Sequence, residues 1–155
     1  MNEIRIRRLL LAGLVTFVVW VAAELVIEQV IGRMLFGNFV DEQWLEMTNV
    51  REWGGANHAL NILIALVNTT MLIWLYASLR PMYGVGVRTA LITSAFGIVL
   101  GFSLAMNGIN LGLFPPQAVL IEVVYEAFEY PIALIAGAGV YEGEHGQREG
   151  GARPQ

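Results

Sequence analysis

The sequence contains no cysteine and no lysine, and only 14% of its 155 residues are charged. The absence of cysteine excludes disulfides, thiolate metal sites and thiol nucleophiles. Soluble domains usually carry about 25% charged residues. Here 56% of the residues are hydrophobic instead, and they gather in long runs. This balance predicts a protein that sits in a lipid bilayer.

The familiar catalytic and nucleotide-binding motifs are also missing. The chain has no GxSxG, HExxH, P-loop or glycine-rich dinucleotide fingerprint. The Glu-x-x-His spacing of helical di-iron sites occurs only at Glu142 and His145, beyond the last apolar run. No basic patch with interleaved aromatic residues suggests nucleic acid as a partner. An enzymatic activity is therefore not indicated, although it stays open.

Four apolar stretches are each long enough to cross a bilayer, which takes about 20 mostly apolar residues. Arg80-Pro81 is expected to end the second stretch and Pro115-Pro116 to open the fourth. We predict an all-α polytopic membrane protein, an antiparallel bundle of four transmembrane helices in one domain over residues 1–140. Residues 141–155 are predicted to form a disordered cytoplasmic tail. The four spans cover about residues 9–31, 56–79, 89–107 and 116–140.

Arginine placement predicts the orientation. Seven arginines flank the predicted spans on the side of the two termini, and two, Arg33 and Arg51, lie on the other side. The positive-inside rule then places both termini in the cytoplasm. A cleaved signal peptide is the alternative for the first span, with Val21-Ala22-Ala23 as the cleavage site. Against it, the helical pattern continues beyond that point.

The first outer loop predicts a further short element. Val40, Trp44 and Met47 recur at helical spacing among acidic residues. Asp41 would cap the start of this helix and Gly54-Gly55 would end it. We predict an amphipathic helix at the outer interface, with Trp44 and Trp53 at headgroup level. An ordinary acidic loop fits the same residues equally well.

Ionisable side chains inside spans are costly and by default mark a functional site. Helical geometry places the acidic residues of the first and fourth spans on one face of each helix. Antiparallel packing places most of them in the outer half of the membrane, above the small residues Ala133, Ala136 and Gly137. These sets predict an acidic pocket open to the outside. The candidate ligands are Glu24, Glu28, His58, Glu122, Glu126 and Glu129, and the supporting polar residues are Asn61, Asn107 and Tyr125.

Carboxyl groups this close cannot all be ionised cheaply, so they share protons or a cation neutralises them. The main hypothesis is that the pocket binds or translocates a cation, either a proton or a divalent metal ion. In a purely structural role, the same residues would join helices by hydrogen bonds of about 0.6 to 2 kcal/mol each. Glu129 would then bond to Asn68, Thr69 or Thr93.

Two other hypotheses remain. The chain could be an accessory subunit of a larger membrane complex or a homo-oligomer, its polar stripes facing partner helices. It could also be a membrane enzyme acting on a lipid or quinone, with carboxyl groups and His58 as acid and base. No nucleophile or cofactor site supports the enzyme, so we rank it last.

Three sequence features carry a family resemblance. The first helix ends in Met34-Leu35-Phe36-Gly37, the second ends in Leu79-Arg80-Pro81, and a short glycine loop precedes the third. In these features the chain resembles small, uncharacterised four-helix families of bacterial inner-membrane proteins. The resemblance covers most of the chain. It implies the same topology and a multi-pass location in the inner membrane, and it carries over no activity and no site residues.

Overall fold

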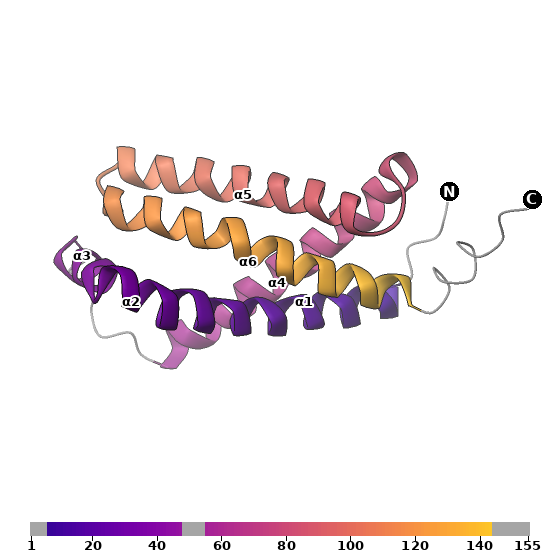
Figure 1. Ribbon diagram of the computed structural model, residues 1–155, viewed down its shortest axis with the longest axis horizontal. Helices are drawn as coiled ribbons and strands as arrows, with labels where there is room; N and C mark the ends of the chain where they lie inside the picture. Colours follow the sequence, from indigo (N-terminus) through magenta and orange to yellow (C-terminus); the bar gives the residue numbers. More distant parts are fainter. Residues whose placement is uncertain (1–5, 48–54, 144–155) are drawn as a thin grey trace, which may run out of the picture.

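The structure is a computed structural model that describes residues 6–47 and 55–143, with the side chains of 47 and 55–58 outside that description. Every element in these ranges is helical (Figure 1). The all-α prediction is therefore confirmed for the described part of the chain. Residues 144–155, most of the predicted tail, lie outside it, as do Trp53 and Gly54.

The first helical rod is longer than predicted and changes its winding midway. It runs as α1 (Ile6–Val26), the π-helix η1 (Ile27–Gly32) and α2 (Arg33–Phe36), and Gly37 ends it with φ +61°. The predicted span, 9–31, lies inside this rod. The sequence pattern did not predict the π-helix, a rare feature that is frequent at functional sites.

The remaining long helices are α4 (Gly55–Tyr83), α5 (Val87–Asn110) and α6 (Pro116–Glu142). The prediction that α4 ends at Arg80-Pro81 is wrong, because the helix continues through Pro81. The break falls instead at Gly84, which has φ +88° and donates its N–H to the Arg80 carbonyl at 2.9 Å. Proline in a last turn loses one backbone bond, whereas glycine reverses the chain.

Three of these helical segments are long and apolar enough to cross a membrane: Ile6–Phe36, Ala59–Tyr83 and Val87–Asn110. By helix length and hydropathy the chain is thus a multi-pass membrane protein. The fourth predicted span, 116–140, forms α6, which is long enough but is not among the apolar helices. Glu122, Glu126 and Glu129 lower its hydropathy, so four apolar spans were predicted and three are found among the described residues.

The long helices pack side by side around α6. α6 contacts α1, α5 and, less extensively, α4, and α4 also contacts α1 and α5. In Figure 1, α1, α5 and α6 run roughly parallel to the long axis, and α4 passes obliquely behind them. The start of α1, the end of α6 and the α4–α5 connection lie at the same end of the molecule, called the terminal end below. The described arginines of that end are Arg7, Arg8, Arg80 and Arg88.

Small residues let the helices approach closely near this terminal end. Gly137 of α6 and Ala133, one turn earlier, are buried, and an added Cβ at Gly137 would collide with Thr16 of α1. Gly13 of α1 meets Thr70 of α4 in the same way. The predicted close packing of small residues is thus seen at Ala133 and Gly137, while Ala136 stays half-buried.

α3 (Phe39–Met47) is the short element predicted in the first outer loop. It is a helix, so the alternative of an acidic loop is wrong. It starts two residues before the predicted cap Asp41, which lies in its first turn with Glu42. Gly54, half of the predicted stop, lies outside the described residues.

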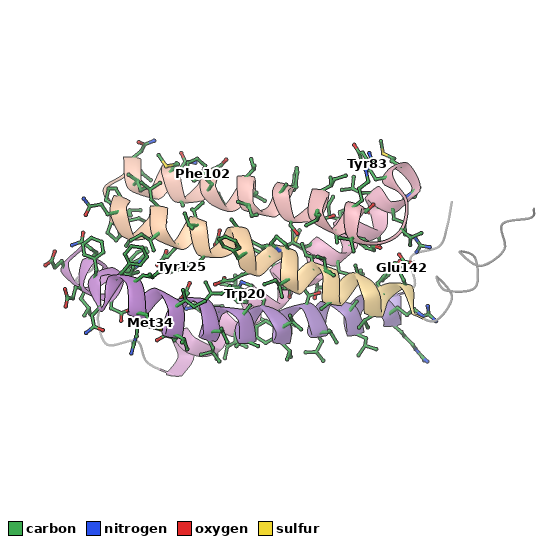
Figure 2. All side chains as sticks on the ribbon, in the orientation of Figure 1. Trp20, Met34, Tyr83, Phe102, Tyr125 and Glu142 are labelled. Atoms are coloured by element: carbon green, nitrogen blue, oxygen red, sulfur yellow. The ribbon has the colours of Figure 1, made fainter. Side chains whose placement is uncertain are left out.

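The outer surface of the long helices is apolar. Leu14 and Val18 of α1, Leu63 of α4 and Val99 of α5 are each about half exposed or more. Figure 2 shows such side chains projecting from the outer sides of the ribbons, for example Met34 and Phe102. A soluble protein rarely exposes contiguous apolar surface on this scale. The surface therefore matches contact with a lipid bilayer.

Candidate functional site: an acidic cavity between three helices

The five glutamates of the predicted pocket lie close together in the structure. Glu24 belongs to α1 and Glu28 to η1, and the other three belong to α6. Glu28 lies within electrostatic range of Glu24, Glu122, Glu126 and Glu129. The side chain of His58, the sixth candidate ligand, is outside the described residues.

Proximity does not amount to a metal-coordination shell here. Over the described side chains, no three carboxyl or imidazole groups converge on a point where they could hold a metal ion. The divalent-metal site at Glu24, Glu28, His58, Glu122, Glu126 and Glu129 therefore stays a prediction.

Glu122 is tied to the short helix α3. The indole N–H of Trp44 donates a hydrogen bond of 2.6 Å to Glu122 Oε1, and the Trp44 ring packs edge-on against Phe114 at 5.4 Å between centroids. The indole N–H of Trp44 is thus directed at α6, and its location at headgroup level stays a prediction. Polar groups that are buried or partly buried in proteins usually form hydrogen bonds, and the indole N–H satisfies this carboxyl group.

Glu129 is the most buried carboxyl group among the described residues, with 1% of its surface exposed. Its Oε1 and the indole Nε1 of Trp20 are both buried, and neither has a hydrogen-bond partner in the described part of the chain. Trp20 lies near enough to interact with Glu129, but the geometry falls short of a hydrogen bond. The predicted partners Thr69 and Thr93 donate instead to carbonyls of their own helices.

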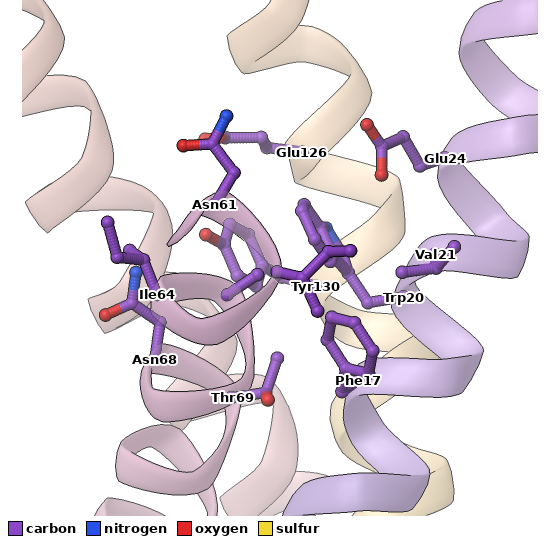
Figure 3. A pocket seen from close by; sticks show the side chains of 12 residues that line it. Phe17, Trp20, Val21, Glu24, Asn61, Ile64, Asn68, Thr69, Glu126 and Tyr130 are labelled. Carbon is purple, nitrogen blue, oxygen red and sulfur yellow. The ribbon is translucent and has the colours of Figure 1, made fainter. Parts of the chain in front are cut away.

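A cavity of about 530 Å³ lies between α1, α4 and α6 (Figure 3). Glu24, Glu126 and Asn61 occupy one end of it, and Trp20 and Tyr130 stand along its middle. The other end is bordered by Phe17 and Thr69. The lining residues are Phe17, Trp20, Val21, Glu24, Asn61, Ile62, Ile64, Ala65, Asn68, Thr69, Glu126 and Tyr130.

Glu126 reaches across two helix interfaces. It lines the cavity shared with α1 and α4, and its Oε2 also lies against α5 at Gly101, where an added Cβ would stand 3.3 Å away. Glycine at 101 therefore leaves room for the carboxyl group.

Tyr125 lies next to the π-helix and apart from the cavity. It is buried, with 7% of its surface exposed, and its hydroxyl sits where a Cβ on Gly32 would be. A small pocket of about 30 Å³ adjoins it and is lined also by Glu28 and Asp41. Figure 2 shows Tyr125 and Trp20 between the ribbons of α1 and α6. Tyr125 thus shares this small pocket with Glu28 and does not line the cavity.

Asn107 does not join the site. It is exposed on α5, and no residue of α5 lines the cavity. The oblique course of α4 brings Asn61 and Asn68 to the cavity, to which α5 contributes no lining residue. Asn107 therefore does not line this cavity, and its role as a supporting residue stays a prediction.

The aromatic lining was not recognised as part of the site. Phe17, Trp20 and Glu24 follow one another at spacings of three and four residues, and Tyr130 follows Glu126 by four. These spacings place each aromatic ring on the face of its helix that carries the carboxyl group. The sequence therefore carries a signal for the aromatic lining in the spacing of these rings from Glu24 and Glu126.

A second polar network closes the terminal end of the molecule. Tyr76 donates its hydroxyl to Glu142 Oε1 at 3.0 Å and accepts the N–H of Gly86 at 3.0 Å. Arg80 pairs with the same carboxyl group at 3.3 Å, and Arg8 donates to the Glu142 carbonyl at 3.1 Å. Glu142 was placed in the predicted tail, yet it ends α6 and holds α1 and α4 to it.

No family model, curated protein or solved structure matches this chain. The resemblance to small bacterial inner-membrane families stays a prediction.

Proposed function

We propose that this membrane protein binds a cation in the cavity between α1, α4 and α6. One observation carries the proposal. Glu24 of α1 and Glu126 of α6 line the same cavity, beside the amide of Asn61 from α4. Charged carboxylates in a low-dielectric site are stable only when paired. A bound cation is the partner that both carboxylates lack among the lining residues, which include no basic side chain.

The surrounding carboxyl groups strengthen the case. Glu122 and Glu129 each interact electrostatically with Glu126, so the negative potential extends beyond the cavity itself. Glu129 has a buried oxygen without a hydrogen-bond partner among the described residues. A cation, or the protons that it replaces, would relieve the repulsion in this group.

The proposal includes α6 as a fourth membrane-spanning helix. Its 27 residues extend about 40 Å at 1.5 Å per residue, which exceeds a bilayer core of about 30 Å. Its exposed residues Leu120, Val124, Phe128 and Ile132 form one apolar stripe at intervals of four. Glu129 lies on the buried side. A helix with its charges buried and its outer stripe apolar suits lipid despite its modest mean hydropathy.

Carbodiimide labelling tests cation binding. Dicyclohexylcarbodiimide modifies protonated carboxyl groups in apolar surroundings, and mass spectrometry locates the modified residue. We expect Glu24 or Glu126 to be labelled and at least one cation from a panel of Na⁺, Ca²⁺, Mn²⁺ and tetraphenylphosphonium to slow the labelling. Exposed Glu42 is the internal control. Labelling of both residues at a rate that no cation changes would refute the proposal.

An accessory subunit of a larger complex is the second candidate. Asn107 is exposed on α5, outside the cavity, and a partner helix could accept its hydrogen bonds. This alternative predicts a fixed partner that co-purifies and a chain that is unstable alone. A stable, monodisperse product from expression of this chain by itself would speak against it.

A further inference from the structure

The size of the cavity bears on which cation it takes. A water molecule occupies about 30 Å³ of the liquid, so one inorganic ion with a single hydration shell would leave much of the 530 Å³ to further water. Pockets of about 300 to 1,000 Å³ are typical of sites for small organic molecules. The volume therefore suits a molecule with a carbon skeleton.

The walls of the cavity have the matching chemistry. Phe17, Trp20 and Tyr130 present aromatic groups to it, and Val21 and Ile64 add aliphatic surface. Aromatic faces attract cations by about 0.5 to 2 kcal/mol, most strongly where water is excluded, and tryptophan is the best of the three. Burial of the apolar surface of a ligand against these apolar walls also contributes favourable free energy of binding through the hydrophobic effect.

The charge lies at one end only. In Figure 3, Glu24 and Glu126 face the same end of the cavity, next to Asn61, and the rings extend away from them. Thr69 at the opposite end carries no charge and donates its hydroxyl to Leu66. The cavity is therefore polarised, with an anionic end and an aromatic body.

We propose that the cavity takes an organic cation, an amine or a quaternary ammonium or phosphonium ion that carries apolar groups. Its charged centre lies beside Glu24 and Glu126. Its apolar groups lie along the rings of Phe17, Trp20 and Tyr130. This inference rests on the proposed function and names the class of cation.

The probe that tests it is tritiated tetraphenylphosphonium, bound to the full-length protein in detergent by equilibrium dialysis. Glu126→Gln keeps the shape of the side chain and removes its charge, so we expect binding at least about tenfold weaker. Trp20→Leu should weaken binding by about 2- to 30-fold. Phe17→Leu repeats this test if the Trp20 variant does not fold. Glu42→Gln removes an exposed carboxylate of α3 outside the cavity and should bind as the wild type does. Dialysis against protein-free micelles corrects for uptake by the detergent.

A matched pair of competitors separates charge from shape. Benzyltrimethylammonium should displace the probe, whereas neopentylbenzene, its uncharged isostere, should not. Equal binding to the wild type and Glu126→Gln, or equal displacement by both competitors, overturns the inference. If Na⁺, Ca²⁺ or Mn²⁺ slows carbodiimide labelling but tetraphenylphosphonium does not bind, cation binding stands and only the organic class fails. If no cation acts in either experiment, both proposals fail.

Discussion

Gly137 and Gly139 lie two residues apart on α6 in different surroundings. A Cβ at Gly137 would stand 2.8 Å from Ile73 Cδ1 and 3.1 Å from the Ala12 carbonyl oxygen, and it would collide with Thr16 Oγ1. A Cβ at Gly139 would meet nothing within 4 Å. The contact at Gly137 includes backbone, which cannot turn aside as a flexible side chain can. The same residue type is thus structural at one position and replaceable at the other.

We therefore expect Gly137→Ala to lower the free energy of unfolding by about 1 to 3 kcal/mol, the usual range for overpacking. Gly139→Ala is the matched control. It should be neutral or stabilise by up to about 1 kcal/mol, because alanine is the better helix former. Unfolding in detergent, followed by circular dichroism, measures both. Equal stabilities for the two variants would contradict the close α1–α6 contact.

The bond from Trp44 to Glu122 makes a second residue-scale prediction. Trp44→Phe keeps an aromatic ring against Phe114 but removes the N–H donor. The half-buried carboxyl group of Glu122 then loses the hydrogen bond from Trp44. We expect α3 to detach more readily, with a loss of about 1 to 3 kcal/mol. Glu122→Gln retains an acceptor oxygen and should be milder. Hydrogen exchange of the α3 amides reports the difference, and equal exchange in the two variants would show that the bond does not hold α3.

At the scale of elements, α6 combines features that pull in opposite directions. Glu122, Glu126 and Glu129 lower its hydropathy, whereas the exposed stripe through Val124 and Phe128 is apolar. Average hydropathy ignores which face a residue lies on, whereas burial separates the faces. The other helices cover the charged side of α6, which suits a helix inserted with partners.

Single cysteines test whether α6 spans the membrane, and the absence of native cysteine makes the experiment direct. Gln117 and Gly143 lie at opposite ends of α6 and are exposed. We expect an impermeant maleimide to label Gln117→Cys in intact cells, and Gly143→Cys only after the membrane is opened. Labelling of both cysteines from outside would contradict the span. Labelling of Gly143→Cys alone from outside would reverse the predicted orientation.

The π-helix η1 is the element that the sequence pattern does not predict. Periodicity predicts that the first helix continues past Val26, which it does, but a change of winding adds no change of composition. Its consequence is local: η1 carries Glu28 toward α6, and Gly32 of η1 leaves room for the hydroxyl of Tyr125.

At the scale of the whole molecule, the two ends differ in how they are held. The terminal end is closed by small-residue packing and by the network of Tyr76, Arg80 and Glu142. The other end carries the carboxyl cluster and the cavity between α1, α4 and α6. Because the helices are held together at the terminal end, α4 can diverge from α6 toward the other end, where the cavity lies.

The closure network should therefore contribute to the stability of the whole molecule. Tyr76 has no surface exposed, and Tyr76→Phe leaves the Gly86 N–H and Glu142 without the hydroxyl. We expect a loss of about 1 to 3 kcal/mol in the free energy of unfolding. Tyr83→Phe, on the exposed end of α4, is the control and should change little. Thermal unfolding of both variants measures the effect. Equal unfolding midpoints would show that packing alone, and not the hydrogen bonds of Tyr76, closes the terminal end.

The sequence by itself determined the helical class, three segments long and apolar enough to span a membrane, and the gathering of glutamates on single helix faces. Local rules suffice for these, since hydrophobic runs predict spans and spacing of three or four predicts a shared face. The short helix α3 and the small residues of the closed end followed from the same rules. The helix face that carries Phe17 and Trp20 together with Glu24 also follows from their spacing in the sequence.

Only the tertiary structure decided which faces meet. The oblique course of α4 brings Asn61 beside Glu24 and Glu126 and places Asn68 farther along the same cavity, and it leaves Asn107 outside. Glu142 was predicted to lie in the tail but belongs to α6, where Tyr76 and Arg80 bind its carboxyl group. Crossing angles depend on how ridges and grooves of side chains fit between helices far apart in the chain. No local pattern carries that information, and the cavity exists only where those crossings leave space.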